Sequence, residues 1–175
     1  MLEDAWISTE TGKPFQHCVH CRFPLLETEV PWLVNKHYRR GECIIEYAIC
    51  QTCRDEIAAG FSDESKAAIR EFLETHIDWP KRLADFMRLD DPRQRLDACV
   101  KCELPRGEAT EFAISGVFDE GGILMEGALP LMLCGGCTRE MANALSPASR
   151  AAWQDFIVQH FAGPASDASG FPGMT

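Results

Sequence analysis

The sequence lacks long apolar runs and an excess of basic residues, and each absence excludes a class of protein. No apolar segment approaches the length of a membrane-spanning helix, and residues 1–15 lack the basic start and apolar stretch of a secretory signal. The 17 lysine and arginine residues are outnumbered by 27 aspartate and glutamate residues, and the net charge of −10 opposes binding to nucleic-acid phosphates. We therefore expect a cytoplasmic protein that does not enter a membrane and whose main partner is not nucleic acid.

Recognisable catalytic motifs are also missing. The sequence contains no phosphate-binding glycine loop, no HExxH motif and no defensible Ser-His-Asp arrangement, and its carboxylates are scattered. We therefore expect that the protein is not an enzyme.

Cysteine is abundant, and eight of the nine cysteines form four Cys-x-x-Cys pairs. The pairs fall into two sets, with 28 residues between the pairs of the first set and 31 between those of the second. The predicted metal ligands are Cys18, Cys21, Cys50 and Cys53 in the first set, and Cys99, Cys102, Cys134 and Cys137 in the second. Such spacing in a reducing compartment is typical of structural zinc sites, where four thiolates surround one ion. The sequence therefore predicts two zinc ions in closed sites.

Two other uses of these pairs remain open. A rubredoxin-like iron site has similar gaps, although the glycine and proline usual around its knuckles are absent from CVHC, CQTC and CVKC. A pair such as Cys134 and Cys137 at the start of a helix could instead have a lowered thiol pKa, as in disulfide oxidoreductases. A thiol-based redox sensor that releases zinc on oxidation is the functional counterpart of this alternative.

The chain is duplicated beyond its cysteines. The segment from Cys53 to His76 aligns without a gap with the segment from Cys137 to His160, at an offset of 84 residues. The predicted divisions are a first zinc unit at 1–80, a linker helix at 81–95, a second zinc unit at 96–161 and a disordered tail at 162–175.

Each unit is predicted to contain a cysteine knuckle, a β-hairpin and two helices. The predicted strands are 29–38 and 42–49 in the first unit, and 111–118 and 123–133 in the second. Short helices are expected at 54–60 and 138–144, and Ser62 and Ser146 are the predicted N-caps of two longer amphipathic helices. We expect these longer helices to pack on their own hairpins or against each other. The predicted fold class is therefore α+β, with two repeated units.

This order of elements resembles the treble-clef zinc finger. The resemblance covers residues 15–76 and 96–160 and implies that the four cysteines of each unit are the metal ligands. Treble-clef proteins bind DNA, RNA or proteins, or act as nucleases, so the resemblance implies no single activity.

Four histidines and the ninth cysteine are further candidates. His17 and His20 flank the first knuckle and could replace a cysteine ligand, but positions beside the ligands or in solvent are the simpler interpretation. His76 and His160 recur at equivalent places and are expected near helix ends. Cys43 lies among apolar strand residues, where a buried, inert thiol is expected and a reactive sensor thiol is the alternative.

The basic and aromatic segment from Lys36 to Arg40 is expected at the tip of the first hairpin. An ordinary solvated turn is one interpretation, and a contact with nucleic acid or an acidic protein is the other. We interpret the chain as a zinc-binding adaptor whose partner is another protein. The alternatives are a nucleic-acid-associated regulator that uses this tip, and the redox sensor described above.

Overall fold

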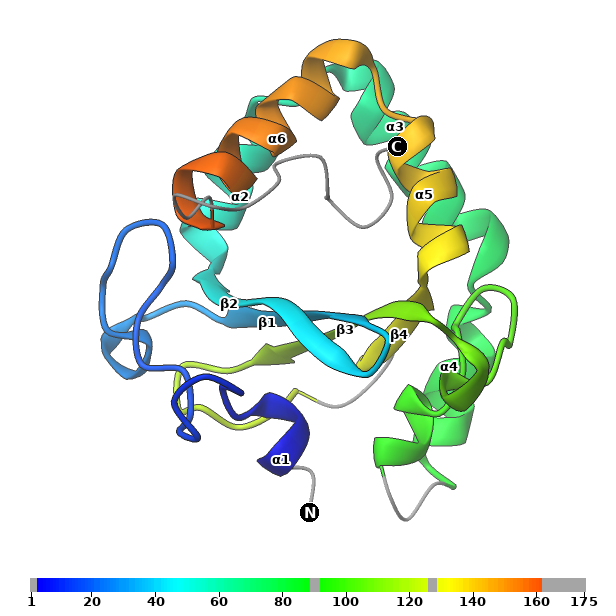
Figure 1. The fold of residues 1–175 in the computed structure, drawn as a ribbon, viewed down its shortest axis with the longest axis horizontal. Coiled ribbons are helices and arrows are strands. Elements are labelled where there is room, and N and C mark those ends of the chain that lie inside the picture. The colour runs from blue at the N-terminus through cyan, green and yellow to red at the C-terminus, as the bar shows by residue number, and fades with distance from the viewer. Residues whose placement is uncertain (1–2, 89–91, 126–128, 162–175) are drawn as a thin grey trace.

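The computed structural model describes residues 3–88, 92–125 and 129–161 of the 175-residue chain. It is an α+β fold, as predicted (Figure 1). The strands are β1 (Trp32–Arg39), β2 (Glu42–Cys50), β3 (Glu111–Phe118) and β4 (Leu131–Cys134). The α-helices are α1 (Glu3–Trp6), α2 (Gln51–Ala59), α3 (Asp63–His76), α4 (Trp79–Phe86), α5 (Gly135–Asn143) and α6 (Pro147–Phe161). Short 3₁₀ turns occupy Leu25–Glu27, Pro92–Leu96 and Arg106–Glu108.

The two hairpins join into one antiparallel sheet with the strand order β2-β1-β3-β4. The central pair is formed by β1 and β3, which are hydrogen-bonded in unbroken register from Trp32 opposite Phe118 to Arg39 opposite Glu111. The first strand of each half is therefore the partner of the first strand of the other half. A shared sheet of this kind makes the two halves depend on each other for their backbone hydrogen bonds.

Helices α2, α3, α5 and α6 lie over one face of this sheet, and the longer ones, α3 and α6, run from their own half to the other (Figure 1). Helix α3 comes from the first half and lies beside α5 of the second half. Helix α6 comes from the second half and packs on the first, where Phe156 makes an edge contact with Tyr47 of β2 at a centroid distance of 5.8 Å. Of the two expected arrangements, packing of each long helix on its own hairpin is wrong, because each one lies over the opposite half. The other, contact between the two long helices, is found at their N-terminal ends.

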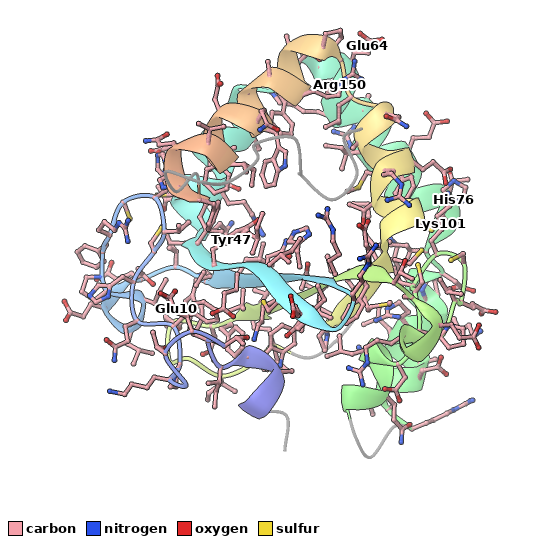
Figure 2. The ribbon with its side chains drawn as sticks, in the orientation of Figure 1. Glu10, Tyr47, Glu64, His76, Lys101 and Arg150 are labelled. Atoms are coloured by element: carbon pink, nitrogen blue, oxygen red, sulfur yellow. The ribbon has the colours of Figure 1, made fainter. Side chains whose placement is uncertain are left out.

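Four serines hold the two long helices where they cross, near the labelled Glu64 and Arg150 (Figure 2). Ser62 caps α3 by accepting a hydrogen bond from the Ser65 backbone N–H, and Ser146 caps α6 by accepting one from the Ser149 backbone N–H, both at 3.2 Å. The caps are also linked across the crossing. The Ser62 N–H donates to Ser149 Oγ at 2.9 Å, and the Ser146 N–H donates to Ser65 Oγ at 2.8 Å. The predicted caps are confirmed, and their cross-links fix the crossing point.

The opposite face of the sheet is covered by the N-terminal segment. Trp32 stacks on Phe118 at 4.5 Å, and Trp6 meets the edge of the same ring at 5.9 Å. Beside them Lys36 is 2% exposed, donates to the Ile7 carbonyl oxygen at 2.7 Å and lies 3.2 Å from the Glu46 carboxylate. This buried ion pair ties the start of the chain to the sheet.

The basic segment from Lys36 to Arg40 is exposed only at its end, which corrects the sequence-based expectation, because Lys36 and His37 are buried and Arg40 alone is fully exposed. Lys36 is buried, and the Arg39 guanidinium donates to the Glu111 carboxylate at 2.8 Å. The turn itself consists of Arg40 and Gly41, both with positive φ. Lys36, the lysine of this segment, is therefore not available for a contact with nucleic acid.

Several element boundaries differ from expectation by a few residues, and two of the differences have a clear local cause. The second return strand was expected over 123–133, but β4 covers Leu131–Cys134, and a turn around Asp119 precedes it. Pro130 lies directly before β4 and lacks a backbone N–H for the sheet, which accounts for the start of the strand at Leu131. The linker helix begins at Trp79, two residues earlier than predicted, because the Asp78 carboxylate caps it through the Lys81 N–H. The predicted tail at 162–175 lies outside the described residues.

Candidate metal centres

The first cysteine cluster lies where β2 passes into α2. Cys18 and Cys21 come from the loop before the Leu25–Glu27 turn, Cys50 ends β2, and Cys53 lies in the first turn of α2. Their Sγ atoms all lie within 4.8 Å of one another. Cys18, Cys50 and Cys53 are buried, while Cys21 is exposed.

Backbone hydrogen bonds shape the loop that carries the first two thiols. The Cys18 N–H donates to the Phe23 carbonyl oxygen, and the Arg22 N–H donates to the Cys18 carbonyl oxygen, both at 3.0 Å. Arg22 closes this turn with a φ of 64°, a left-handed conformation that is uncommon for a residue other than glycine. The Cys50 N–H points at Cys18 Sγ at 3.5 Å, so a strand end supplies a donor to the sulfur.

The second cluster repeats this geometry where β4 passes into α5. Its Sγ atoms also lie within 4.8 Å of one another, and the four cysteines are Cys99, Cys102, Cys134 and Cys137. Glu103 takes the place of Arg22 with a φ of 60°, and the Cys134 N–H points at Cys99 Sγ at 3.4 Å. Gly135 allows the close approach of α5 to β3, because a Cβ atom there would lie 2.8 Å from the Glu111 Cβ.

The two donor sets fit a tetrahedral metal ion. An ion at 2.3 Å from four sulfurs places those sulfurs about 3.8 Å apart, and Cys102 Sγ lies 3.6 Å from Cys134 Sγ. All nine cysteines are free thiols, so disulfide bonds do not account for the clusters. The structure thus brings together all eight predicted ligands as two groups of four, each able to hold one metal ion.

The thiols within a cluster differ in acidity. Burial acts to raise the pKa of Cys18, but backbone N–H donors, the largest contribution coming from Cys50, outweigh it and lower that pKa. Burial also acts on Cys99, whose backbone donors nevertheless bring its pKa down to about 7. Burial, together with hydrogen bonds among the sulfurs, raises the pKa values of Cys53 and Cys137. Four adjacent thiolates require a cation, and a bound dication would supply that charge.

The long helix of the opposite half covers each cluster, and the covering contacts differ. At the first cluster His20 Nδ1 lies 3.1 Å from His160 Nε2 of α6. At the second cluster Lys101 occupies the position of His20, pairs with Glu140 and lies over the Phe72 ring of α3, 4.8 Å from its centroid (Figure 2). These contacts between distant segments were missed from the sequence, because spacing along the chain does not indicate which helix covers which knuckle.

The remaining candidates lie outside the clusters. No histidine belongs to either four-cysteine group among the described residues, and His17 is exposed. Cys43 opens β2 and is half-buried, with its Sγ 3.6 Å from a Glu46 carboxylate oxygen. Burial raises the pKa of the Cys43 thiol, which favours the interpretation as an inert thiol.

Comparisons of the chain with protein-family models, with curated proteins and with solved structures find no match. Within the described ranges, no helix combines the length and apolar character that crossing a membrane requires.

Proposed function

We propose that this protein is a non-catalytic adaptor that contains two structural zinc ions and binds another protein. The observation that carries the proposal is that thiols fill all four positions of each cluster. A zinc ion held by four thiolates has no open position for water or substrate, and such sites stabilise small folds instead of catalysing reactions. Elemental analysis of protein purified without added metal tests the first part. Two zinc ions per chain are expected, and one ion or bound iron would contradict it.

An exposed apolar patch supports the second part. Leu26 and Ile123 are 67% and 68% exposed, and we call them, together with Phe23 of the same knuckle loop at 48%, the knuckle patch. Leu26 lies against Gly122, next to Ile123, so the first knuckle loop and the turn after β3 form one surface. Clustered exposed apolar side chains of this kind are typical of protein-binding sites.

Acidic side chains flank the knuckle patch beside Leu26 and Ile123, while exposed Arg22 adjoins Phe23. Glu27 adjoins Leu26, Glu120 lies in the turn before Ile123, and both are exposed. The whole chain has a net charge of −10. The partner that fits this surface is a protein segment with apolar anchors flanked by lysine or arginine, since complementary charge favours association.

Affinity capture from a lysate of the source organism tests the adaptor role. A double variant, Leu26→Asp with Ile123→Asp, should lose a protein that the unmodified chain retains. The matched control is Leu83→Asp with Met87→Asp, which changes two other exposed apolar residues, at 51% and 81% exposure, near α4. Equal capture by all three proteins, with two zinc ions in each, would reject the knuckle patch while leaving the metal centres in place.

A redox sensor is the second candidate, because each cluster has one exposed cysteine, Cys21 or Cys102. An exposed thiolate is open to peroxide, which would oxidise two cysteines to a disulfide, form two water molecules and release the zinc. Stoichiometric zinc release at micromolar peroxide, reversed by a thiol reductant, would favour this candidate over the adaptor.

A further inference from the structure

Each cysteine cluster presents one of its four ligands to solvent. Cys21 and Cys102 are exposed, whereas each of the other six cysteines is at most 6% exposed. A bound dication holds all four sulfurs of a cluster as thiolates, so access and local charge decide which of them reacts with a molecule in solution. The exposed cysteine of each cluster is therefore the one that such a molecule meets first.

The residue that follows the exposed cysteine has opposite charge in the two halves. Arg22 follows Cys21, and Glu103 follows Cys102. Both residues close their knuckle in the left-handed conformation, with φ angles of 64° and 60°, and both side chains are exposed. Within the described part of the chain, neither side chain is paired with an opposite charge. The two knuckles thus share a backbone conformation and differ in the sign of the charge beside the reactive sulfur.

The other charges near the knuckles preserve this difference. Burial, the neighbouring His20 and then Arg22 lower the pKa of His160, so the charge of Arg22 acts on the helix that covers the first knuckle. In the second knuckle loop the two cations, Lys101 and Arg106, are each paired with a carboxylate and add little net charge. The glutamate that ends the 3₁₀ turn is present in both halves and does not distinguish them.

The sign of the charge selects the reagent. We infer that Cys21 is the site at which this protein reacts with small disulfides that carry carboxylate groups, and that this reaction opens the first centre while the second stays closed. The positive Arg22 attracts a carboxylate toward Cys21, and the negative Glu103 repels it from Cys102. The inference rests on the zinc centres proposed above.

The reaction is a thiol–disulfide exchange. The Cys21 thiolate attacks one sulfur of the disulfide, the S–S bond of that molecule breaks, and its second sulfur leaves as a thiolate with the electron pair. A mixed disulfide at Cys21 leaves three thiolates at the first centre, so its metal should be released more readily. The same loop carries Phe23 and Leu26 of the knuckle patch, so the reaction would alter the surface proposed to bind a partner.

Two aromatic disulfides of different charge test the inference on the zinc-loaded full chain. Dithiobisnitrobenzoate carries two carboxylates, whereas dithiodipyridine is neutral, and both react by the same exchange. Mass spectrometry of the modified peptides gives the rate at each cysteine, and a zinc-indicator dye follows metal release. At low salt the anionic reagent should modify Cys21 about fivefold to tenfold faster than Cys102, the size expected of two opposed charges in water. The neutral reagent should modify both at similar rates.

A charge exchange between the knuckles provides the matched variant. Arg22→Glu with Glu103→Arg places at each turn a residue that already occupies the equivalent left-handed position in the other half. The anionic reagent should then modify Cys102 first, with the neutral reagent unaffected. In the unmodified chain, salt at about 1 M should abolish the preference for Cys21, because the charges are screened.

Three results would overturn the inference in protein that contains two zinc ions. They are equal rates at Cys21 and Cys102 with the anionic reagent, the same preference with the neutral reagent, and an unchanged order in the charge-exchange variant. The zinc content is measured before either reagent is added. A value other than two ions per chain would reject the proposed zinc centres, so the two failures are distinguished.

Discussion

Replacement of Cys50 by serine should unfold both halves of the molecule together. Cys50 is 4% exposed, ends β2 and contributes its thiol to the first cluster, while its N–H points at Cys18 Sγ. Serine in its place leaves three thiols, and hard oxygen is a poor replacement for sulfur at a zinc ion. The first centre should therefore lose most of its affinity for metal.

The size of the expected loss of stability in Cys50→Ser follows from the binding free energy of the metal and from the sheet that both halves share. Structural zinc contributes an apparent binding free energy of roughly 10–16 kcal/mol, and a small domain has a total free energy of unfolding of about 5–15 kcal/mol. Loss of even half of the zinc-binding free energy would therefore remove most of the free energy of unfolding. Because β1 pairs with β3 and α6 covers the first half, melting of the first centre also removes partners from the second.

The assay combines elemental analysis with thermal unfolding followed by circular dichroism. The variant should contain at most one zinc ion and melt at a much lower temperature in a single transition. Cys43→Ser is the matched control, since Cys43 belongs to neither cluster, and it should keep two zinc ions and nearly its full stability. An unchanged melting temperature in Cys50→Ser, or a second half that melts separately at the original temperature, would refute this reasoning.

Three further predictions concern the buried charges and the acidic surface. Lys36→Met should lower the free energy of unfolding by about 3 kcal/mol in urea denaturation, because it leaves the partly buried Glu46 carboxylate without its cation. Lys66→Met is the control, and it should change the free energy of unfolding little, because the Lys66 side chain is 38% exposed. Burial lowers the pKa of His37 to about 4, whereas an unfolded chain has a value near 6.5. The unfolded state therefore binds the proton first as pH falls. The contribution of neutral His37 to the free energy of unfolding is therefore complete above pH 6.5 and decreases toward pH 4, with about 1 kcal/mol lost at pH 5.5. In urea denaturation measured across this pH range, the His37→Gln variant should not show this loss. Fluorescence anisotropy at about 150 mM salt should detect no micromolar binding to generic duplex DNA, since the net charge is −10 and Lys36 is buried; micromolar affinity would contradict this.

Features that depend on neighbouring residues could be predicted from the sequence. The cysteine spacing led to both clusters, and the Ser62 and Ser146 caps were found at the predicted positions because a capping hydroxyl acts within three residues. The strand over 111–118 was also predicted with its observed bounds. In each case the pattern and the contact lie in the same short segment.

Burial of a charged residue is harder to predict, because it depends on a partner that is distant in the chain. Lys36 alternates with Trp32 and Val34 along β1, so the period of two did place it on a buried face. The lysine was nevertheless assigned to an exposed hairpin tip, because the groups that compensate its buried charge, the Ile7 carbonyl and Glu46, lie in other segments of the chain. For Lys36, the alternation of apolar residues along the strand predicted burial correctly, whereas the charge of the side chain suggested exposure.

The crossing of the long helices shows a limit that duplication itself imposes. When two halves present similar hairpins and similar amphipathic helices, a helix that fits its own hairpin also fits the other one. Hydrophobic periodicity is identical for both arrangements, so it cannot choose between them. The residues that the long helices bring to the clusters do not decide between these arrangements either, because His160 and Phe72 have the identical counterparts His76 and Phe156 in the other half. His160 meets His20 at the first cluster, whereas Phe72 meets Lys101 at the second. The serine cross-links then fix both helices at the crossing. A duplicated chain can thus repeat both its motifs and the residues with which its long helices pack, so the sequence alone does not show which half each helix covers.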